Sequence, residues 1–165
     1  MNYQDRLKAI IEGIPEPTSS KIILEDRTQE WRNSKGELHR DNDMPAIIDA
    51  NGNQLWYQNG KRHRDNDMPA IIYNDGTKIW YQNDQRHRDN DMPAVIDADG
   101  TKEWYQNDQL HRDNDKPAII CCDGTLYWYK NGLCHRDMER PAVVGYCGTA
   151  EYWKNGVIIK GGLLY

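Results

Sequence analysis

One short sequence recurs along this chain of 165 residues at a fixed interval. In its second copy it reads His63-Arg64-Asp65-Asn66-Asp67, followed by Met-Pro-Ala-Ile-Ile. The histidines that open the copies are 24 residues apart and are all the histidines of the chain: His39, His63, His87, His111 and His135. A constant period in this range indicates a repeat protein, in which a unit buries its apolar side only by stacking on its neighbours. We therefore expect one elongated domain.

Each repeat is predicted to form a β-hairpin. The Ala-Ile-Ile run is β-branched and too short for a helix, and a proline is tolerated at the first residue of a strand. A glycine turn follows, mostly Asn-Gly or Asp-Gly, which favours a type I′ turn with positive φ at both central residues. The returning strand then carries a Trp-Tyr pair. The turn glycines are Gly52, Gly76, Gly100, Gly124 and Gly148, and the tryptophans are Trp56, Trp80, Trp104 and Trp128.

The pattern predicts an all-β fold, an elongated single-layer antiparallel sheet of stacked 24-residue hairpins. The pairs Ile47-Ile48 and Trp56-Tyr57 are adjacent in sequence, so their members point to opposite faces of the sheet. Both faces are therefore partly apolar. Such a sheet must curl strongly, lay its linkers across one face, or pair with another chain.

The repeat array is expected to span residues 21–156. Residues 1–20 are interpreted as a short helix over 2–12 and a linker, because Gly13 and two prolines end the apolar stripe. Residues 157–165 form an apolar tail without the polar linker of the other repeats. We expect this tail to dock, either on its own sheet or, as we favour, on a second copy in a homodimer. The residues assigned to self-association are Val157, Ile158, Ile159, Leu163, Leu164 and Tyr165.

The polar linkers invite catalytic and metal-binding interpretations. His-Arg-Asp resembles the protein kinase catalytic loop, but the partner motifs of that family are missing. Asp41-Asn42-Asp43 offers oxygen ligands for calcium, but only two or three of them. Five histidines at one repeat position have similar surroundings, whereas a catalytic site needs one constellation with separated pKa values. We predict no enzyme, no metal and no cofactor. Arginine and aspartate side chains of neighbouring repeats should pair, and each histidine should pack beside the tryptophans or donate to a backbone carbonyl.

The net charge limits the kinds of partner expected for this chain, and the cysteines indicate its compartment. The formal net charge is −5, which disfavours nucleic acid and anionic membrane surfaces. The first residues lack the layout of a signal peptide, and no run approaches the length of a membrane span. The four cysteines have no regular spacing, so we expect free thiols in a reducing compartment, the cytoplasm.

Trp56, Asn59-Gly60, Lys61 and His63, with the later Asp75-Gly76, resemble the MORN repeat over roughly residues 31–156. The chain departs from that pattern by an extra residue between Trp and Asn-Gly, by Arg after His, and by the added Asp-Asn-Asp-x-Pro-Ala. This spelling is similar to repeat proteins of large DNA viruses of amoebae, which would also allow a location in the virus particle. The resemblance implies twisted sheets of stacked hairpins that often dimerise and serve as scaffolds, tethers or binding modules.

The function expected from the sequence is a non-enzymatic scaffold for protein binding or assembly. Its protein partner is not identified by the sequence, and a homodimer is expected. The alternative is an adaptor at a membrane surface that contacts phospholipid headgroups, a role attached to some MORN proteins.

Overall fold

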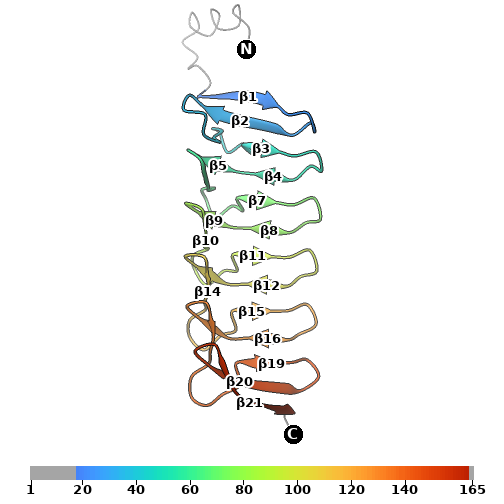
Figure 1. Cartoon of the computed structure of the whole chain (residues 1–165), viewed down its shortest axis with the longest axis vertical. Helices are drawn as coiled ribbons and strands as arrows, with labels where there is room; N and C mark the ends of the chain where they lie inside the picture. Colours follow the sequence, from blue (N-terminus) through green and yellow to red (C-terminus); the bar gives the residue numbers. More distant parts are fainter. Residues whose placement is uncertain (1–17, 164–165) are drawn as a thin grey trace, which may run out of the picture.

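The computed structural model describes residues 18–163, which contain strands and turns but no helix. Figure 1 shows an elongated molecule whose strands lie one above another along the long axis, with β1 and β21 at opposite ends. The predicted all-β class and the stacked antiparallel hairpins are confirmed. The helix predicted over residues 2–12 falls outside the described residues, as do Leu164 and Tyr165.

The main sheet has 13 strands, and the hairpin of one unit pairs directly with the hairpin of the next. Its inner strands contain two residues each, whereas the first and last pairs are longer. The sheet is open, and its strands are β1 (Ser19–Ile23), β2 (Gln29–Asn33), β3 (Ile47–Ile48), β4 (Gln54–Leu55), β7 (Ile71–Ile72), β8 (Lys78–Ile79), β11 (Val95–Ile96), β12 (Lys102–Glu103), β15 (Ile119–Ile120), β16 (Leu126–Tyr127), β19 (Val143–Val144), β20 (Thr149–Lys154) and β21 (Val157–Leu163).

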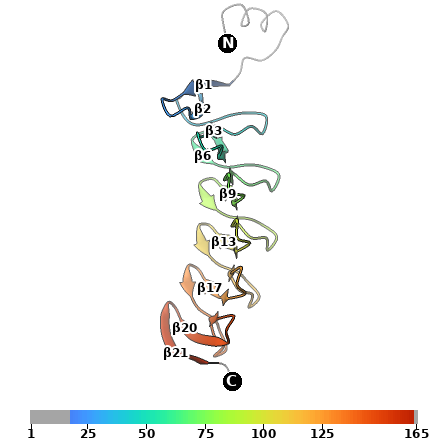
Figure 2. The same ribbon diagram turned by 90° about the vertical axis from the view of Figure 1, so that its right-hand side faces the viewer.

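Each inner unit also contains a second, smaller hairpin, which the sequence reasoning missed. One residue, Trp56, separates the end of β4 from the start of this hairpin, so tryptophan marks a corner and does not lie within a strand. Figure 2 shows the small hairpins beside the main sheet. They pair β5 (Tyr57–Gln58) with β6 (Lys61–Arg62), β9 (Tyr81–Gln82) with β10 (Gln85–Arg86), β13 (Tyr105–Gln106) with β14 (Gln109–Leu110), and β17 (Tyr129–Lys130) with β18 (Leu133–Cys134).

The turn types differ from those predicted. In the turn from Asp49 to Gly52, the glycine N–H donates to the Asp49 carbonyl at 3.0 Å, and only Gly52 has a positive φ, +84°. The predicted type I′ turn at Gly52 and its equivalents is therefore wrong, because the connection between β3 and β4 is longer than a two-residue loop. The type I′ geometry occurs instead in the small hairpin, where Asn59 and Gly60 have φ of 49° and 80°.

The core is a thin row of small clusters shared between neighbouring units. Trp56 packs with Ala70, Ile71 and Tyr81 of the next unit. The alanine after each linker proline is completely buried where the tryptophan N–H donates to its carbonyl, as in Trp56 to Ala70 at 2.8 Å. No large side chain of residues 18–163 is completely buried. Of the three ways to cover an apolar face, the structure uses the linkers, which lie against the tryptophan rings.

Two longer hairpins form the ends of the main sheet. β1 pairs with β2 at one end, and β20 pairs with β21 at the other. The tail that begins at Val157 therefore folds back on its own sheet as the outermost strand. A register irregularity at Tyr152 and Trp153 stands where the inner units have their corner. The end units are thus straight where the inner units bend.

Candidate functional site

The linkers form a ladder of arginine–aspartate pairs between neighbouring units. Arg64 donates from Nε and Nη2 to the two carboxylate oxygens of Asp43, at 2.7 and 2.8 Å. A fork that grips both oxygens is the strongest geometry for such a pair. The predicted pairing of neighbouring repeats is confirmed, and it recurs in Arg88–Asp67, Arg112–Asp91 and Arg136–Asp115.

The same guanidinium group makes two further contacts. Its Cζ lies 3.8 Å from the centre of the Trp56 ring, and Nη1 donates to the Pro69 carbonyl at 3.2 Å. The Arg64 side chain is only 9 % exposed, although the partner carboxylate is more than half exposed. Stacking on tryptophan and hydrogen bonds in one plane suit arginine and not lysine. Each linker is therefore attached to the sheet through one arginine.

The aspartate sits in a tight turn that offers a second acceptor. Asn42 and Asp43 both have positive φ, 59° and 54°, and the Asp43 carbonyl accepts a hydrogen bond from Trp56 Nε1 at 3.1 Å. Asparagine and aspartate adopt this conformation more readily than other residues with a side chain. We call the unit of Asp43, Trp56 and Arg64 an arginine rung. The other rungs are Asp67, Trp80 and Arg88; Asp91, Trp104 and Arg112; and Asp115, Trp128 and Arg136.

The rungs hold their carboxyl groups in the ionised form. In the third rung, hydrogen bonds from Arg112 and then Lys116 lower the pKa of Asp91 to about 2. The pKa of Asp43 is lowered by its hydrogen bond with Arg64. An ion pair of this kind stabilises the charged carboxylate. The rungs are consequently electrostatic contacts between units.

The histidines are engaged at both ring nitrogens. His39 Nε2 lies 3.0 Å from Asp41 Oδ1, and its Nδ1 accepts the backbone N–H of Asn59 at 3.1 Å. The expected hydrogen bond to a backbone carbonyl is therefore wrong, because the ring meets a donor and a carboxylate. Nδ1 must be the bare nitrogen and Nε2 must carry the proton. His63, His87, His111 and His135 make the same pair of contacts.

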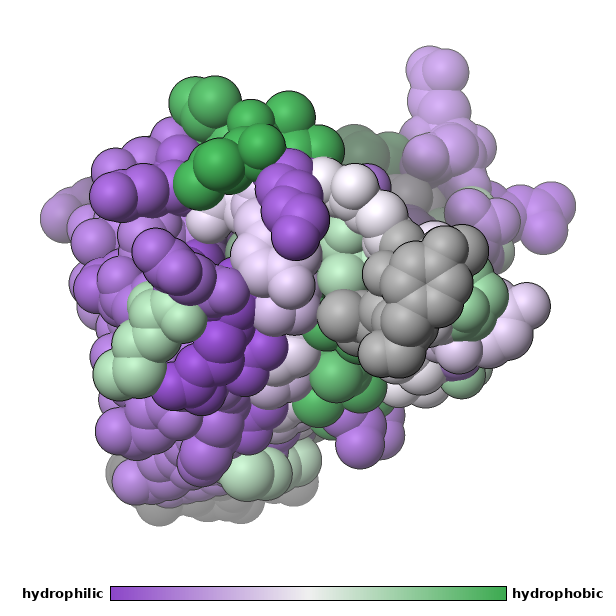
Figure 3. Space-filling model, turned by 90° about the horizontal axis from the view of Figure 1, so that it is seen from below, coloured by the Kyte–Doolittle hydropathy of each residue, from purple (hydrophilic) through white to green (hydrophobic). Residues whose placement is uncertain are grey.

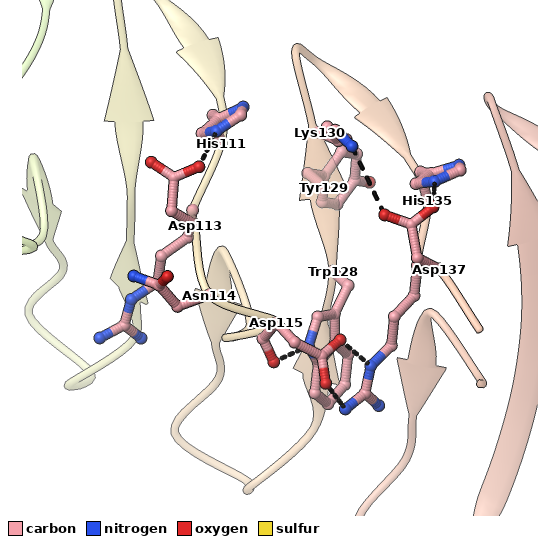
Figure 4. A pocket seen from close by; sticks show the side chains of 11 residues that line it. His111, Asp113, Asn114, Asp115, Trp128, Tyr129, Lys130, His135 and Asp137 are labelled. Carbon is pink, nitrogen blue, oxygen red and sulfur yellow. Dashed lines mark hydrogen bonds and ion pairs between the residues drawn. The ribbon is translucent and has the colours of Figure 1, made fainter.

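Shallow grooves run between successive linkers. Figure 4 shows the one between the linkers that open at His111 and His135, with Asp115, Trp128 and Tyr129 in its wall. The grooves at the other linkers have the same residue types and volumes of about 230 to 340 Å³. Within residues 18–163, no three His, Cys, Asp or Glu side chains are placed to hold a metal ion. The grooves repeat one polar environment.

The last groove is larger, with a volume of about 540 Å³. At the positions of an arginine rung it has Glu139, Tyr152 and Lys160, and the Lys160 ammonium lies 5.4 Å from the centre of the Tyr152 ring. Met138 and Glu139 occupy the left-handed turn, with φ of 61° and 54°. The contacts of the inner rungs are thus only partly reproduced at the C-terminal end.

A second ladder links the small hairpins. The Asp84 N–H donates to the Arg62 carbonyl at 3.0 Å, and Arg62 Nε donates back to Asp84 Oδ1 at 2.8 Å. The backbone contact recurs between Gly60 and Leu38 at 2.9 Å, where the turn residue has no side chain. Sequence reasoning missed this ladder. Its signal is that aspartate in the turn accompanies arginine 22 residues earlier, at Arg62–Asp84 and Arg86–Asp108.

The described residues assigned to self-association, Val157, Ile158, Ile159 and Leu163, lie on the outermost strand. Val157, Ile158 and Ile159 of β21 are 65 %, 51 % and 65 % exposed. Figure 3 looks onto this end of the molecule and shows hydrophobic groups at its surface. Leu163 belongs to the same strand. An apolar strand with an open edge favours pairing with another strand.

The cysteines are free thiols, as expected. Cys122 and Cys147 are exposed, whereas Cys134 is buried, and burial raises the pKa of its thiol to about 11. A buried thiol with a raised pKa is a poor nucleophile. Cys134 therefore acts as a small apolar residue in the last core cluster, beside Trp128 and Ala142.

Neither a scan against protein-family models nor a search of curated proteins found a match to this chain. The MORN resemblance therefore remains a prediction from the residues. No helix within residues 18–163 is long and apolar enough to cross a bilayer.

Proposed function

We propose that this chain is a non-enzymatic repeat scaffold that joins a second copy of itself through β21. The observation that carries the proposal is the exposure of Val157, Ile158 and Ile159 along an outermost strand. In residues 18–163 no strand pairs with the outer side of β21. An open edge is a template for a further strand, and proteins cover such edges.

A two-fold axis is the simplest way to cover this edge. The same strand from two copies can pair antiparallel, so that one surface meets itself and the assembly closes. The main sheet would then continue from one copy into the other. Two sheets joined in this way form one longer array of repeats that presents the linker grooves of both copies to a protein partner.

The other end of the sheet is less suited to the same role. β1 also exposes apolar side chains, and Ile23 is 65 % exposed. Charged residues stand on both sides of this stretch, Lys21 before it and Glu25 after it. Charges that flank an apolar edge oppose pairing with another strand. β21 contains one charged residue, Lys160, after three consecutive apolar side chains.

The MORN resemblance supports the same function. The family implies stacked hairpins that serve as scaffolds and often dimerise. The inner grooves between linkers have a similar lining, which suits repeated contact with a partner better than a single chemical step. We therefore place the chain among binding and assembly modules, either in the cell that makes it or in a virus particle.

The oligomeric state tests this function. Light scattering during gel filtration should give twice the chain mass of 19.3 kDa for the intact protein. The double variant Val157→Lys and Ile159→Lys should run as a monomer, because two positive charges on each copy would face each other across the axis.

The matched control is Ile23→Lys, which places one charge on an equally exposed isoleucine at the opposite end of the sheet. This variant should remain a dimer. A monomeric intact protein at high micromolar concentration would contradict the proposal. So would a dimer that survives the β21 variant and dissociates in the β1 variant.

A further inference from the structure

Trp31 of β2 and Arg40 of the first linker form an incomplete arginine rung, which has the tryptophan and the arginine but no aspartate. The backbone around Trp31 matches that of the complete rungs: its N–H donates to the Ala46 carbonyl at 2.8 Å, as Trp56 does to Ala70. Its carbonyl accepts the N–H of His39 at 2.9 Å, as Trp56 accepts that of His63. Trp31 is therefore the structural equivalent of Trp56.

Arg40 occupies the position of the rung arginine. Its Cζ lies 3.6 Å from the centre of the Trp31 ring, and Nη1 donates to the Pro45 carbonyl at 3.1 Å. Both contacts reproduce those of Arg64 with Trp56 and Pro69. The guanidinium plane is thus held in the orientation that the other rungs use to bind a carboxylate.

Three donors of this incomplete rung have no acceptor within residues 18–163. In the complete rungs, Nε and Nη2 of the arginine bind the aspartate carboxylate, and Trp Nε1 binds the carbonyl of that same aspartate. At the incomplete rung the Arg40 side chain makes one hydrogen bond, to the Pro45 carbonyl, and Trp31 Nε1 makes none in the described chain. One aspartate in a tight turn would satisfy all three.

The site is accessible and positively charged. Trp31 and Arg40 are both half-buried, so part of each side chain is exposed. The Lys21 ammonium lies 5.2 Å from the centre of the Trp31 ring and adds a second positive charge. Burial lowers the pKa of the Arg40 guanidinium, which shows that it is partly withdrawn from water.

We propose that Trp31 and Arg40 form a receptor for an acidic β-turn of a protein partner. The partner contributes the carboxylate of an aspartate to Nε and Nη2 of Arg40, and the backbone carbonyl of that aspartate to Trp31 Nε1. A phosphate or a free carboxylate satisfies the arginine fork but supplies no carbonyl to the indole. The turn is therefore the ligand that fits all three donors, and the same binding mode occurs four times inside this chain.

The probe for this site is a short β-hairpin peptide with the turn Asp-Asn-Asp-Met, as in residues 65–68. Titrated into the full ¹⁵N-labelled chain, it should shift the Trp31 Nε1–H and Arg40 Nε–H signals with one saturable affinity. A peptide with Asn in place of the second Asp should bind at least tenfold more weakly. Inorganic phosphate should shift the Arg40 signal and leave the Trp31 signal unchanged.

Two variants separate the receptor from general attraction between charges. Arg40→Lys keeps the charge and loses the fork, so the peptide should bind at least tenfold more weakly. Arg32→Gln removes a neighbouring arginine that is already paired with Glu30, so binding should be unchanged. Equal binding of both peptides, or equal loss in both variants, would overturn the proposal. So would signals of Trp31 and Arg40 that no peptide shifts.

The receptor is independent of the proposed dimer. It lies at the end of the sheet opposite β21, so the monomeric variant of β21 should bind the peptide with unchanged affinity (Figure 1). Failure of the dimer and failure of the receptor are therefore read from different experiments.

Discussion

The arginines of the linkers show how one side chain can join three parts of a repeat. Arg88 stacks on Trp80, donates to the Pro93 carbonyl and grips Asp67 of the preceding linker. The pairing of arginine with aspartate was predictable, because both recur at the repeat period. The bond from Trp80 Nε1 to the Asp67 carbonyl was not, because a backbone acceptor leaves no mark in the sequence.

The lowered pKa of Asp91 gives a prediction for acid stability. A carboxyl group with a lower pKa in the folded state stabilises the fold above its unfolded pKa, and this stability is lost as pH falls through the folded pKa. For Asp91 that window runs from about 3.8 down to about 2. We expect Asp91→Asn to be less stable than the intact protein at pH 5, with the difference shrinking towards pH 2 in urea unfolding.

Asp97→Asn is a control of opposite sign. Burial, and then the charges of Asp99 and Asp75, raise the pKa of Asp97, so its ionised form opposes folding at neutral pH. This variant should be more stable than the intact protein at pH 7, and the advantage should fade as acid protonates Asp97. A difference between Asp91→Asn and the intact protein that stays constant from pH 5 to pH 2 would contradict the role given to the rung.

The small hairpin is the element that turns a simple meander into a unit with a corner. Its strands have two residues each, and its turn is Asn-Gly or Asn-Asp. Strands this short give no alternation that a sequence pattern can detect. Asn59-Gly60 by itself predicts a tight hairpin turn, but Asn51-Gly52 is the same dipeptide and was assigned that turn instead. Sequence reasoning therefore found one hairpin where the structure has two.

The two kinds of hairpin turn predict energetic coupling between neighbouring units. Asp84 has a positive φ of 71°, and its carboxylate accepts a hydrogen bond from the Arg62 side chain. Where the turn residue is a glycine, its N–H donates to a residue of the preceding hairpin that is not arginine: Leu38, Leu110 or Cys134. We expect a double-mutant cycle of Arg62→Leu and Asp84→Gly to show coupling of about 1 kcal/mol in favour of the matched pairs, measured by urea unfolding.

The reciprocal cycle uses Leu110→Arg and Gly132→Asp, which place a charged pair where the Gly132 N–H donates to the Leu110 carbonyl at 2.9 Å. The losses in the free energy of unfolding caused by the two single changes should add up to more than the loss caused by the double change. Additivity of the single changes in both cycles would show that the hairpins contact each other only through their backbones.

The whole molecule is a linear array whose stability comes from contacts between neighbours. Its clusters join adjacent units, and no large side chain of residues 18–163 is completely buried. The stability of such an array is a sum over units and interfaces. The overall fold followed from the period and the β-branched runs. The straight end hairpins did not, because the irregular repeats at both ends obscure the pattern there.

Small-angle scattering on the intact protein tests the central claim, that two copies join end to end through β21. Thirteen strands at about 4.8 Å give one copy a length of about 60 Å, and a shared edge would give the pair about 120 Å with the cross-section of one array. The Val157→Lys and Ile159→Lys variant should return to about 60 Å. A particle of doubled mass with the length of one copy would place the contact on a face of the sheet and contradict the claim.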